Sequence, residues 1–233
     1  MKNINKIIMA IVMAVMTFPK ESIAQEKFEV HGNATLVSDY VWRGAYQASG
    51  VSIQPSLTLS YVGINLNVFG NQSLSKDAKE FDINLSYSIK NFTITVSDYW
   101  WAGVDKSYGD YKNDHFFEAT LGYKFGPSFP LSLSWSTLFA GGDKDENGDL
   151  QASTYIAASC PISLPADITL TPSVGFTPWE GMYHDKTAVT DVALTASKNI
   201  QISKDFGIPV FLQAIASPAY DRTYLVAGLS IGF

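Results

Sequence analysis

Residues 224–233 read Tyr-Leu-Val-Ala-Gly-Leu-Ser-Ile-Gly-Phe, and this stretch indicates the fold. Side chains of a β-strand alternate between its two faces with a period of two. The large apolar side chains of this stretch therefore share one face, whereas mostly small or polar side chains share the other. A strand of a transmembrane β-barrel needs both faces, because one meets lipid and the other meets the lumen.

The same alternation recurs along the chain, and short turns separate the strands in turn with longer polar loops. Short turns at one end and long loops at the other are the arrangement of outer-membrane barrels. We predict an all-β fold, a single antiparallel transmembrane β-barrel of about twelve strands. Ten or fourteen strands also fit, since the phase of strands eight, ten and eleven is ambiguous. The expected strands lie near residues 28–43, 51–61, 64–70, 80–89, 92–101, 117–125, 131–139, 152–160, 168–176, 188–202, 210–216 and 224–233.

The first residues predict export. Lys2 and Lys6 precede an apolar run over residues 7–18, and Ser-Ile-Ala at residues 22–24 fits a small-x-small cleavage site. The run is shorter than the roughly 20 apolar residues of a membrane-spanning helix, and no later stretch is longer. We predict a secretory signal peptide at residues 1–24, a barrel at residues 25–233, and the outer membrane of a Gram-negative bacterium as the location.

Aromatic residues gather near both ends of the expected strands. Trp and Tyr favour membrane interfaces because they have apolar bodies and polar tips. Two rings of aromatic residues therefore favour a barrel in contact with outer-membrane lipid over the alternative, the core of a soluble β-sandwich. The predicted aromatic girdle consists of Tyr40, Trp42, Trp100 and Trp101 on the loop side, and of Tyr61, Tyr87 and Tyr123 on the turn side.

Residues 38–44 read Ser-Asp-Tyr-Val-Trp-Arg-Gly. This stretch resembles the first-strand signature of the TorF-type porins, small bacterial outer-membrane β-barrels, whose usual form is Ser-x-Tyr-x-aromatic-Arg-Gly. The resemblance implies a barrel of the porin type, often without an established substrate. Phe233 at the end of the last strand also resembles the assembly signal of outer-membrane proteins, which implies the barrel-assembly machinery as a partner during insertion.

Charged residues on the inward faces indicate what the lumen could do. Within the expected first strand, Asp39 and Arg43 face inward while Tyr40 and Trp42 face lipid. A lumenal arginine needs acidic neighbours, and the other strands supply them. These residues form either an ion-pair network that fills the barrel or a charged constriction that selects solutes. The acidic candidates for the lumen lining are Glu80, Asp82, Glu118 and Asp191.

The function predicted from these features is a porin-like channel for passive diffusion of small solutes, with a weak preference for cations. The alternative is a non-conducting barrel that presents its outer loops or supports a partner. The chain has 22 acidic and 16 basic residues and no basic stripe, so nucleic acid is excluded as a partner.

Catalytic and metal-binding patterns are weak. Residues 143–149 partly match a calcium loop, but the twelfth position, which should be Glu, is Thr154. The three histidines show no metal-ligand spacing, and His115 beside Asp114 is the nearest approach to a catalytic pair. Cys160 is the only cysteine, so no internal disulfide can form. We expect no enzymatic activity, no cofactor and no metal.

Overall fold

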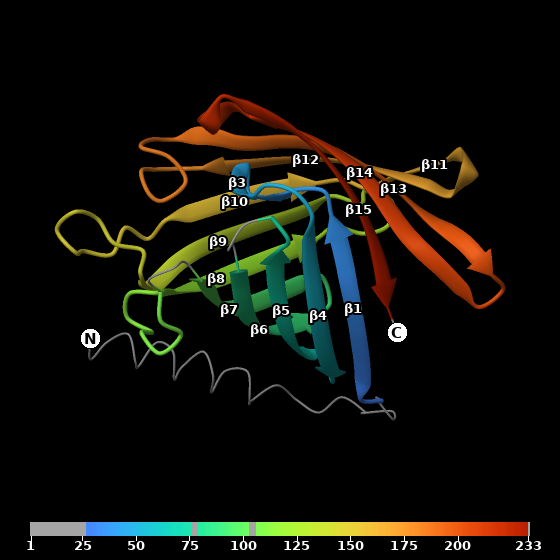
Figure 1. Cartoon of the computed structure of the whole chain (residues 1–233), viewed down its shortest axis with the longest axis horizontal. Coiled ribbons are helices and arrows are strands. Elements are labelled where there is room, and N and C mark those ends of the chain that lie inside the picture. The colour runs from blue at the N-terminus through green and yellow to red at the C-terminus, as the bar shows by residue number, and fades with distance from the viewer. Residues whose placement is uncertain (1–26, 76–78, 103–105, 233) are drawn as a thin grey trace.

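The computed structural model describes residues 27–75, 79–102 and 106–232, and the predicted signal peptide and Phe233 lie outside them. The described chain is almost entirely β-structure, with two short 3-10 turns, η1 (Pro165–Asp167) and η2 (Pro218–Tyr220) (Figure 1). No helix in these ranges is long and apolar enough to cross a membrane. The strands are β1 (Glu29–Val37), β2 (Tyr40–Trp42), β3 (Ala45–Ala48), β4 (Ser52–Tyr61), β5 (Ile64–Ser73), β6 (Lys79–Ile89), β7 (Phe92–Ala102), β8 (His115–Lys124), β9 (Ser132–Gly141), β10 (Thr154–Ser159), β11 (Ile162–Leu164), β12 (Ile168–Thr177), β13 (Ala188–Ser203), β14 (Phe206–Ser217) and β15 (Arg222–Gly232).

The strands close into a twelve-stranded antiparallel barrel, which confirms the predicted fold. β1 pairs with β4 on one side and with β15 on the other, so the first and last strands meet (Figure 1). At the opposite side of the ring, β10 pairs with both β9 and β12. The short strand β11 continues the edge of β10 along β12. The phase of β10 is now defined, because Tyr155 points inward to Asp191.

The predicted alternation is present in β15. The side chain of Leu225 is 63% exposed on the outside, whereas Val226 beside it is 4% exposed on the inside. Leucines of other strands, such as Leu85, Leu121 and Leu194, are exposed on the outer wall in the same way. The outer wall is thus an apolar surface, whereas a soluble sandwich would bury these side chains between its sheets.

The two ends of the barrel differ as predicted. Tight turns close the hairpins at one end, and β1 begins and β15 ends there (Figure 1). Val62 and Gly63 form one of these turns with φ angles of 49° and 77°, the left-handed backbone of a type I′ hairpin. Longer loops, including residues 142–153 and 178–187, connect the strands at the other end.

The expected first strand over residues 28–43 is wrong in its second half. β1 ends at Val37, and the following residues form a separate hairpin in which β2 pairs with β3. Arg43 and Gly44 have φ angles of 50° and 78°, so they form a tight turn of the type I′ class. The chain therefore reverses direction at Arg43 instead of continuing along the barrel wall.

The β2–β3 hairpin lies inside the barrel, against an apolar part of the inner wall. Val37, Ala193, Ile215 and Val226 form a buried apolar cluster, and Val41 of the hairpin packs against it. Tyr46 of β3 stacks on Tyr224 of β15 with ring centroids 5.3 Å apart. The inner wall at β1, β13, β14 and β15 thus supports one side of the hairpin.

The exposed outer wall generates a test of its environment. Leu85 on β6 is 53% exposed outside, and the adjacent Ser86 points inward. We expect Leu85→Arg to lower the free energy of unfolding in lipid vesicles by about 2–4 kcal/mol, because an arginine on the lipid face must enter hydrocarbon. Ser86→Arg is the matched control and should cost clearly less. Equal losses for the two variants, measured by denaturant titration, would show that the wall does not face hydrocarbon.

Candidate functional site

The tip of the β2–β3 hairpin carries Arg43, which forms an ion pair with Glu118 of β8. The two guanidinium nitrogens donate to the two carboxylate oxygens at 2.5 and 2.8 Å. The Arg43 side chain is 11% exposed and the Glu118 side chain is fully buried. Arg43 also donates to the phenol oxygen of Tyr183 in the β12–β13 loop. Burial raises the pKa of the Tyr183 phenol, which Arg43 partly opposes, so the phenol stays protonated.

Aromatic rings surround the Arg43 guanidinium. The Cζ atom of Arg43 lies 4.4 Å from the ring centroid of Trp42, 4.6 Å from that of Tyr155 and 5.5 Å from that of Tyr183. Trp42 in turn packs against Tyr99 and Trp101 of β7, with centroids 5.8 and 5.3 Å away. A desolvated cation over aromatic faces gains about 2 kcal/mol or more. The ion pair and these rings together hold the hairpin tip at one position in the lumen.

The hairpin crosses the barrel from one wall to the other. It leaves the wall between β1 and β4, and its tip reaches Glu118 on β8, which lies across the ring of strands. On another side, the Ser217 hydroxyl contacts the carbonyl oxygens of Gly44 and Thr190 at 2.9 and 2.7 Å. A side chain at Gly44 would place its Cβ only 2.2 Å from the Thr190 oxygen, so only glycine fits. The hairpin is therefore a transverse barrier in the lumen.

A second acidic group lies beside the hairpin. Glu80 and Asp82 point inward from β6, and the Tyr40 phenol of the hairpin lies against Glu80. One oxygen of each carboxylate is buried without a hydrogen-bond partner. Asp191 on β13 accepts hydrogen bonds from Tyr155 at 3.1 Å and from Thr190 at 2.9 Å. In the described residues, none of these three carboxylates has a cation within 4.0 Å.

The sequence-predicted lumen residues are mostly brought together. Glu80, Asp82, Glu118 and Asp191 lie around the β2–β3 hairpin inside the barrel, and Arg43 lies at the hairpin tip. Asp39 does not join them. Its carboxylate accepts hydrogen bonds from the Tyr46 hydroxyl and the Gly50 amide at 2.7 and 3.1 Å, so it stabilises the first loop.

The predicted aromatic girdle needs correction on the loop side. Tyr40 and Trp42 were expected to meet lipid, but both lie inside the barrel because the hairpin turns inward. Trp101 also faces inward, since it packs against Trp42. Trp100 points outward and packs against Tyr108. The turn-side residues share outward faces with apolar neighbours, and their contact with lipid stays a prediction: Tyr61, Tyr87 and Tyr123.

His115 pairs with Asp98 and not with Asp114. Its Nδ1 lies 2.7 Å from the Asp98 carboxylate and its Nε2 lies 2.7 Å from the Tyr108 carbonyl oxygen. Both ring nitrogens therefore face acceptors within the chain, and neither is directed at a nucleophile. Asp114 accepts a hydrogen bond from the Ser107 amide instead. This pair holds the β7–β8 loop against the outer wall and has no geometry for catalysis.

The partial calcium motif also has a structural explanation. Both carboxylate oxygens of Asp143 accept hydrogen bonds from Ser153, at 2.8 and 2.5 Å. Asp145 accepts from the amides of Asn147 and Asp149, both at 2.9 Å. Across the described ranges, no group of three His, Cys, Asp or Glu side chains has a metal-binding arrangement.

Sequence reasoning missed Tyr155 and Tyr183, which contact Arg43 from β10 and from the β12–β13 loop. Neither residue has a motif around it, and only the closed barrel brings them to the hairpin. The hairpin itself had a signal. An Arg-Gly pair after alternating residues fits a two-residue turn with glycine at its second position.

Comparisons with known proteins agree with this architecture. A family model described as "Bacterial protein of unknown function (Gcw_chp)" matches residues 21–221, so the chain belongs to the Gcw_chp family. A search of curated protein sequences found no match. Neither the family model nor the similar structures carry the TorF-type name, so that resemblance stays a prediction.

Solved structures with a similar fold are outer-membrane channels. The KdgM porin is 9% identical with a TM-score of 0.50, and 88% of this chain and 97% of that chain are covered. KdgM in complex with disordered oligogalacturonate gives 8% identity, a TM-score of 0.51 and the same coverage. An outer-membrane channel from Pseudomonas putida F1 is 13% identical with a TM-score of 0.45, covering 93% of this chain and 98% of the other. At 8–9% identity, the likeness to KdgM concerns the fold alone.

The Arg43–Glu118 ion pair generates a stability test. We expect Arg43→Met or Glu118→Leu alone to lower the free energy of unfolding by about 3–5 kcal/mol, since each leaves one buried charge without its partner. The double variant should lose less than the two single losses combined. A denaturant double-mutant cycle measures the coupling, and strictly additive losses would contradict the pairing.

Proposed function

We propose that this member of the Gcw_chp family is an outer-membrane, porin-like channel for passive diffusion of small solutes, with a weak cation preference. The observation that carries the proposal is a lumen lined by small polar side chains that solvent still reaches. On the short-turn side of the hairpin, Asn67, Thr95 and Thr120 point inward and are partly exposed. A barrel filled by its own side chains would bury them.

The β2–β3 hairpin supports a constriction in this pathway. Its tip contacts the walls at β8, β10 and β14, so solutes would have to pass beside the hairpin. A short constriction bordered by a wider hydrated region sets both the conductance and the selectivity of a channel. The proposed channel therefore passes small solutes and excludes bulky ones.

Charge around the hairpin supports the cation preference. Arg43 is neutralised by Glu118, whereas Asp191 has no nearby cation in the described chain. Glu80 and Asp82 lie side by side and buried, so together they add at most one negative charge. An acidic ring favours cations. Oligogalacturonate, which the KdgM complex contains, is a polyanion and would be repelled here. We do not propose it as a solute.

A non-conducting barrel is the second candidate. The buried hairpin tip favours it, because Arg43 and its aromatic neighbours fill the space at that level. In this case the hairpin is a permanent plug, and the loops at the long-loop end would carry the function. Conductance distinguishes the two candidates.

The first functional prediction concerns the barrier. We expect discrete conductance steps from the refolded protein in a planar bilayer. Conductance should rise severalfold when a glycine–serine linker replaces residues 40–48. Trp42→Ala is the milder variant and should raise it less. Steps of equal size in all three proteins would contradict a constriction at the hairpin. A silent wild type with a conducting linker variant would instead identify a plug.

The second functional prediction concerns charge. Glu80→Gln combined with Asp82→Asn removes the single negative charge that these two adjacent carboxyl groups can share beside Tyr40, so the reversal potential in a salt gradient should shift toward anions. Asp145→Asn combined with Asp185→Asn removes two exposed loop carboxylates and is the matched control. An anion-selective wild type, or equal shifts for both pairs, would contradict the proposed cation preference.

A further inference from the structure

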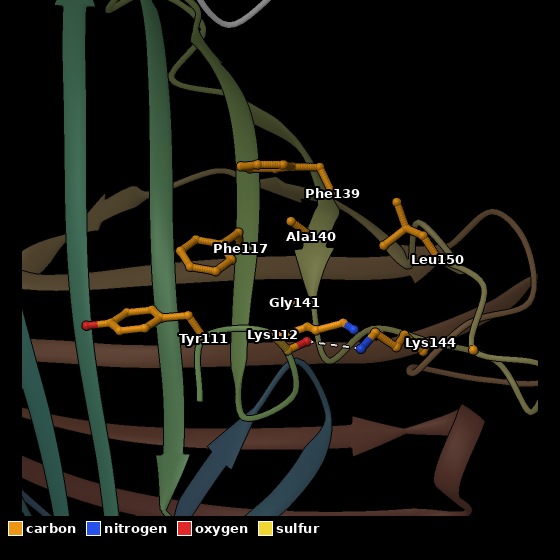
Figure 2. A pocket seen from close by; sticks show the side chains of 9 residues that line it. Tyr111, Lys112, Phe117, Phe139, Ala140, Gly141, Lys144 and Leu150 are labelled. Carbon is orange, nitrogen blue, oxygen red and sulfur yellow. Dashed lines mark hydrogen bonds between the residues drawn. The ribbon is translucent and has the colours of Figure 1, made fainter. Parts of the chain in front are cut away.

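A pocket of about 380 Å³ lies on the outer wall of the barrel near the long-loop end (Figure 2). Two loops border it, one before β8 and one after β9. Phe117 of β8 and Phe139 and Ala140 of β9 form its floor together with Gly141. Tyr111, Lys112, Lys144, Gly148 and Leu150 of the loops complete the lining.

The pocket opens to the outside and not to the lumen. Phe117 follows the outward parity of β8, because its neighbour Glu118 points inward to Arg43. Its cross-strand partners on the same face are Asp98 and Ala140. A β-bulge lies between Phe117 and Glu118 in their pairing with β9, and Phe139 lies 6.3 Å from Phe117 between ring centroids. The bulge creates the broad aromatic floor.

The loop wall of the pocket is held in place. His115 at the start of β8 is fully buried, and it binds Asp98 and the Tyr108 carbonyl oxygen. The Tyr111 ring stacks on His115 with centroids 4.1 Å apart. Residues 108–111 are thereby fastened to the outer wall, so the pocket exists before any ligand arrives.

Two lysines that form no ion pair among the described residues border the pocket. The Lys144 ammonium donates to the Lys112 carbonyl oxygen at 3.0 Å and to the Asn113 side-chain oxygen at 2.8 Å, both uncharged acceptors. Figure 2 shows the Lys112 and Lys144 side chains pointing toward one another. Neither lysine has a carboxylate within 4.0 Å among the described residues, and no carboxylate lines the pocket. The Asp110 carboxylate of the loop before β8 attracts Lys144 only from farther away. Two adjacent cations repel each other, and an anion between them would remove this repulsion.

We infer that this pocket binds a phosphorylated, acylated lipid of the outer leaflet. Lys112 and Lys144 would bind the phosphate, and an acyl chain would lie against Phe117, Phe139 and Leu150. Basic pockets on membrane proteins bind lipid head groups in this way. The inference rests on the proposed outer-membrane location, because the long-loop end then lies at the outer leaflet.

The pocket has an apolar floor and a basic rim, and this combination favours a lipid over a free anion. A free phosphate is strongly hydrated, and the aromatic floor offers it no hydrogen-bond donor. A lipid buries its chain on the apolar floor and leaves its head group at the lysines, so both halves of the pocket are used. The chain has more acidic than basic residues, so its net charge repels anions. Attraction of a phosphate must therefore come from the two lysines.

The test measures lipid binding to the refolded barrel in detergent by native mass spectrometry. The probes are bisphosphorylated lipid A, the same lipid after removal of both phosphates, and inorganic phosphate. We expect one bound bisphosphorylated lipid on the wild type. Lys112→Met combined with Lys144→Met should weaken it about tenfold or more, equivalent to about 1.4 kcal/mol. Leu150→Asn should weaken it by a smaller factor.

Lys90→Met combined with Lys204→Met removes two exposed lysines at the short-turn end and should leave binding unchanged. Equal affinity for the dephosphorylated lipid, or an unaffected Lys112/Lys144 double variant, would overturn the inference. Displacement of the lipid by millimolar inorganic phosphate would overturn it in favour of a free-anion site. Conductance of the same variants separates the two proposals. If the Lys112/Lys144 double variant loses lipid binding but keeps wild-type conductance, the result supports the lipid pocket. If the wild-type barrel binds lipid but does not conduct, the result rejects the proposed channel and leaves the lipid pocket intact.

Discussion

Closure of the backbone hydrogen-bonding ring is the constraint on which the rest of the structure depends. β1 pairs with β15, and β10 pairs with β12, so neither the first strand nor the last is left as an edge. A sheet within hydrocarbon must have no open edge, because an unpaired amide or carbonyl there has no water to bind. Closure also turns the alternation of side chains into an inside and an outside. The exposed leucines and the lumenal polar residues are consequences of the same ring.

The interior is divided into two unlike parts, and the hairpin fits both. Val37, Ala193, Ile215 and Val226 make one part apolar, and Val41 packs there. The other part carries Glu118, which binds Arg43. A uniformly polar lumen would leave Val41 without a contact, and a uniformly apolar lumen could not hold a guanidinium. The amphipathic hairpin thus has one favourable orientation, with its tip directed away from the strands between which it begins.

The sequence predicted the barrel well and the position of the hairpin poorly, for physical reasons. Strand alternation is local, so the twelve strands and the outward leucines could be predicted from short windows. The apparent alternation continues through residues 38–43, which hid the end of β1 at Val37. The alternation along β7 did indicate that Trp101 faces the lumen, because Trp101 shares the face of Thr95 and Ser97. The tyrosines around Arg43 come from distant segments, and only barrel closure brings them together.

The Arg43 site in the lumen and the Lys112/Lys144 pocket on the outer wall differ in whether their charges are paired. Inside the barrel, the one guanidinium of the hairpin tip is matched by a buried carboxylate and by phenol and indole rings, so Arg43 holds the structure together. Outside, Lys112 and Lys144 lie near each other beside aromatic side chains, and in the described chain no carboxylate pairs with either. A matched buried charge stabilises one arrangement of the chain, whereas an unmatched pair of like charges is relieved by a ligand.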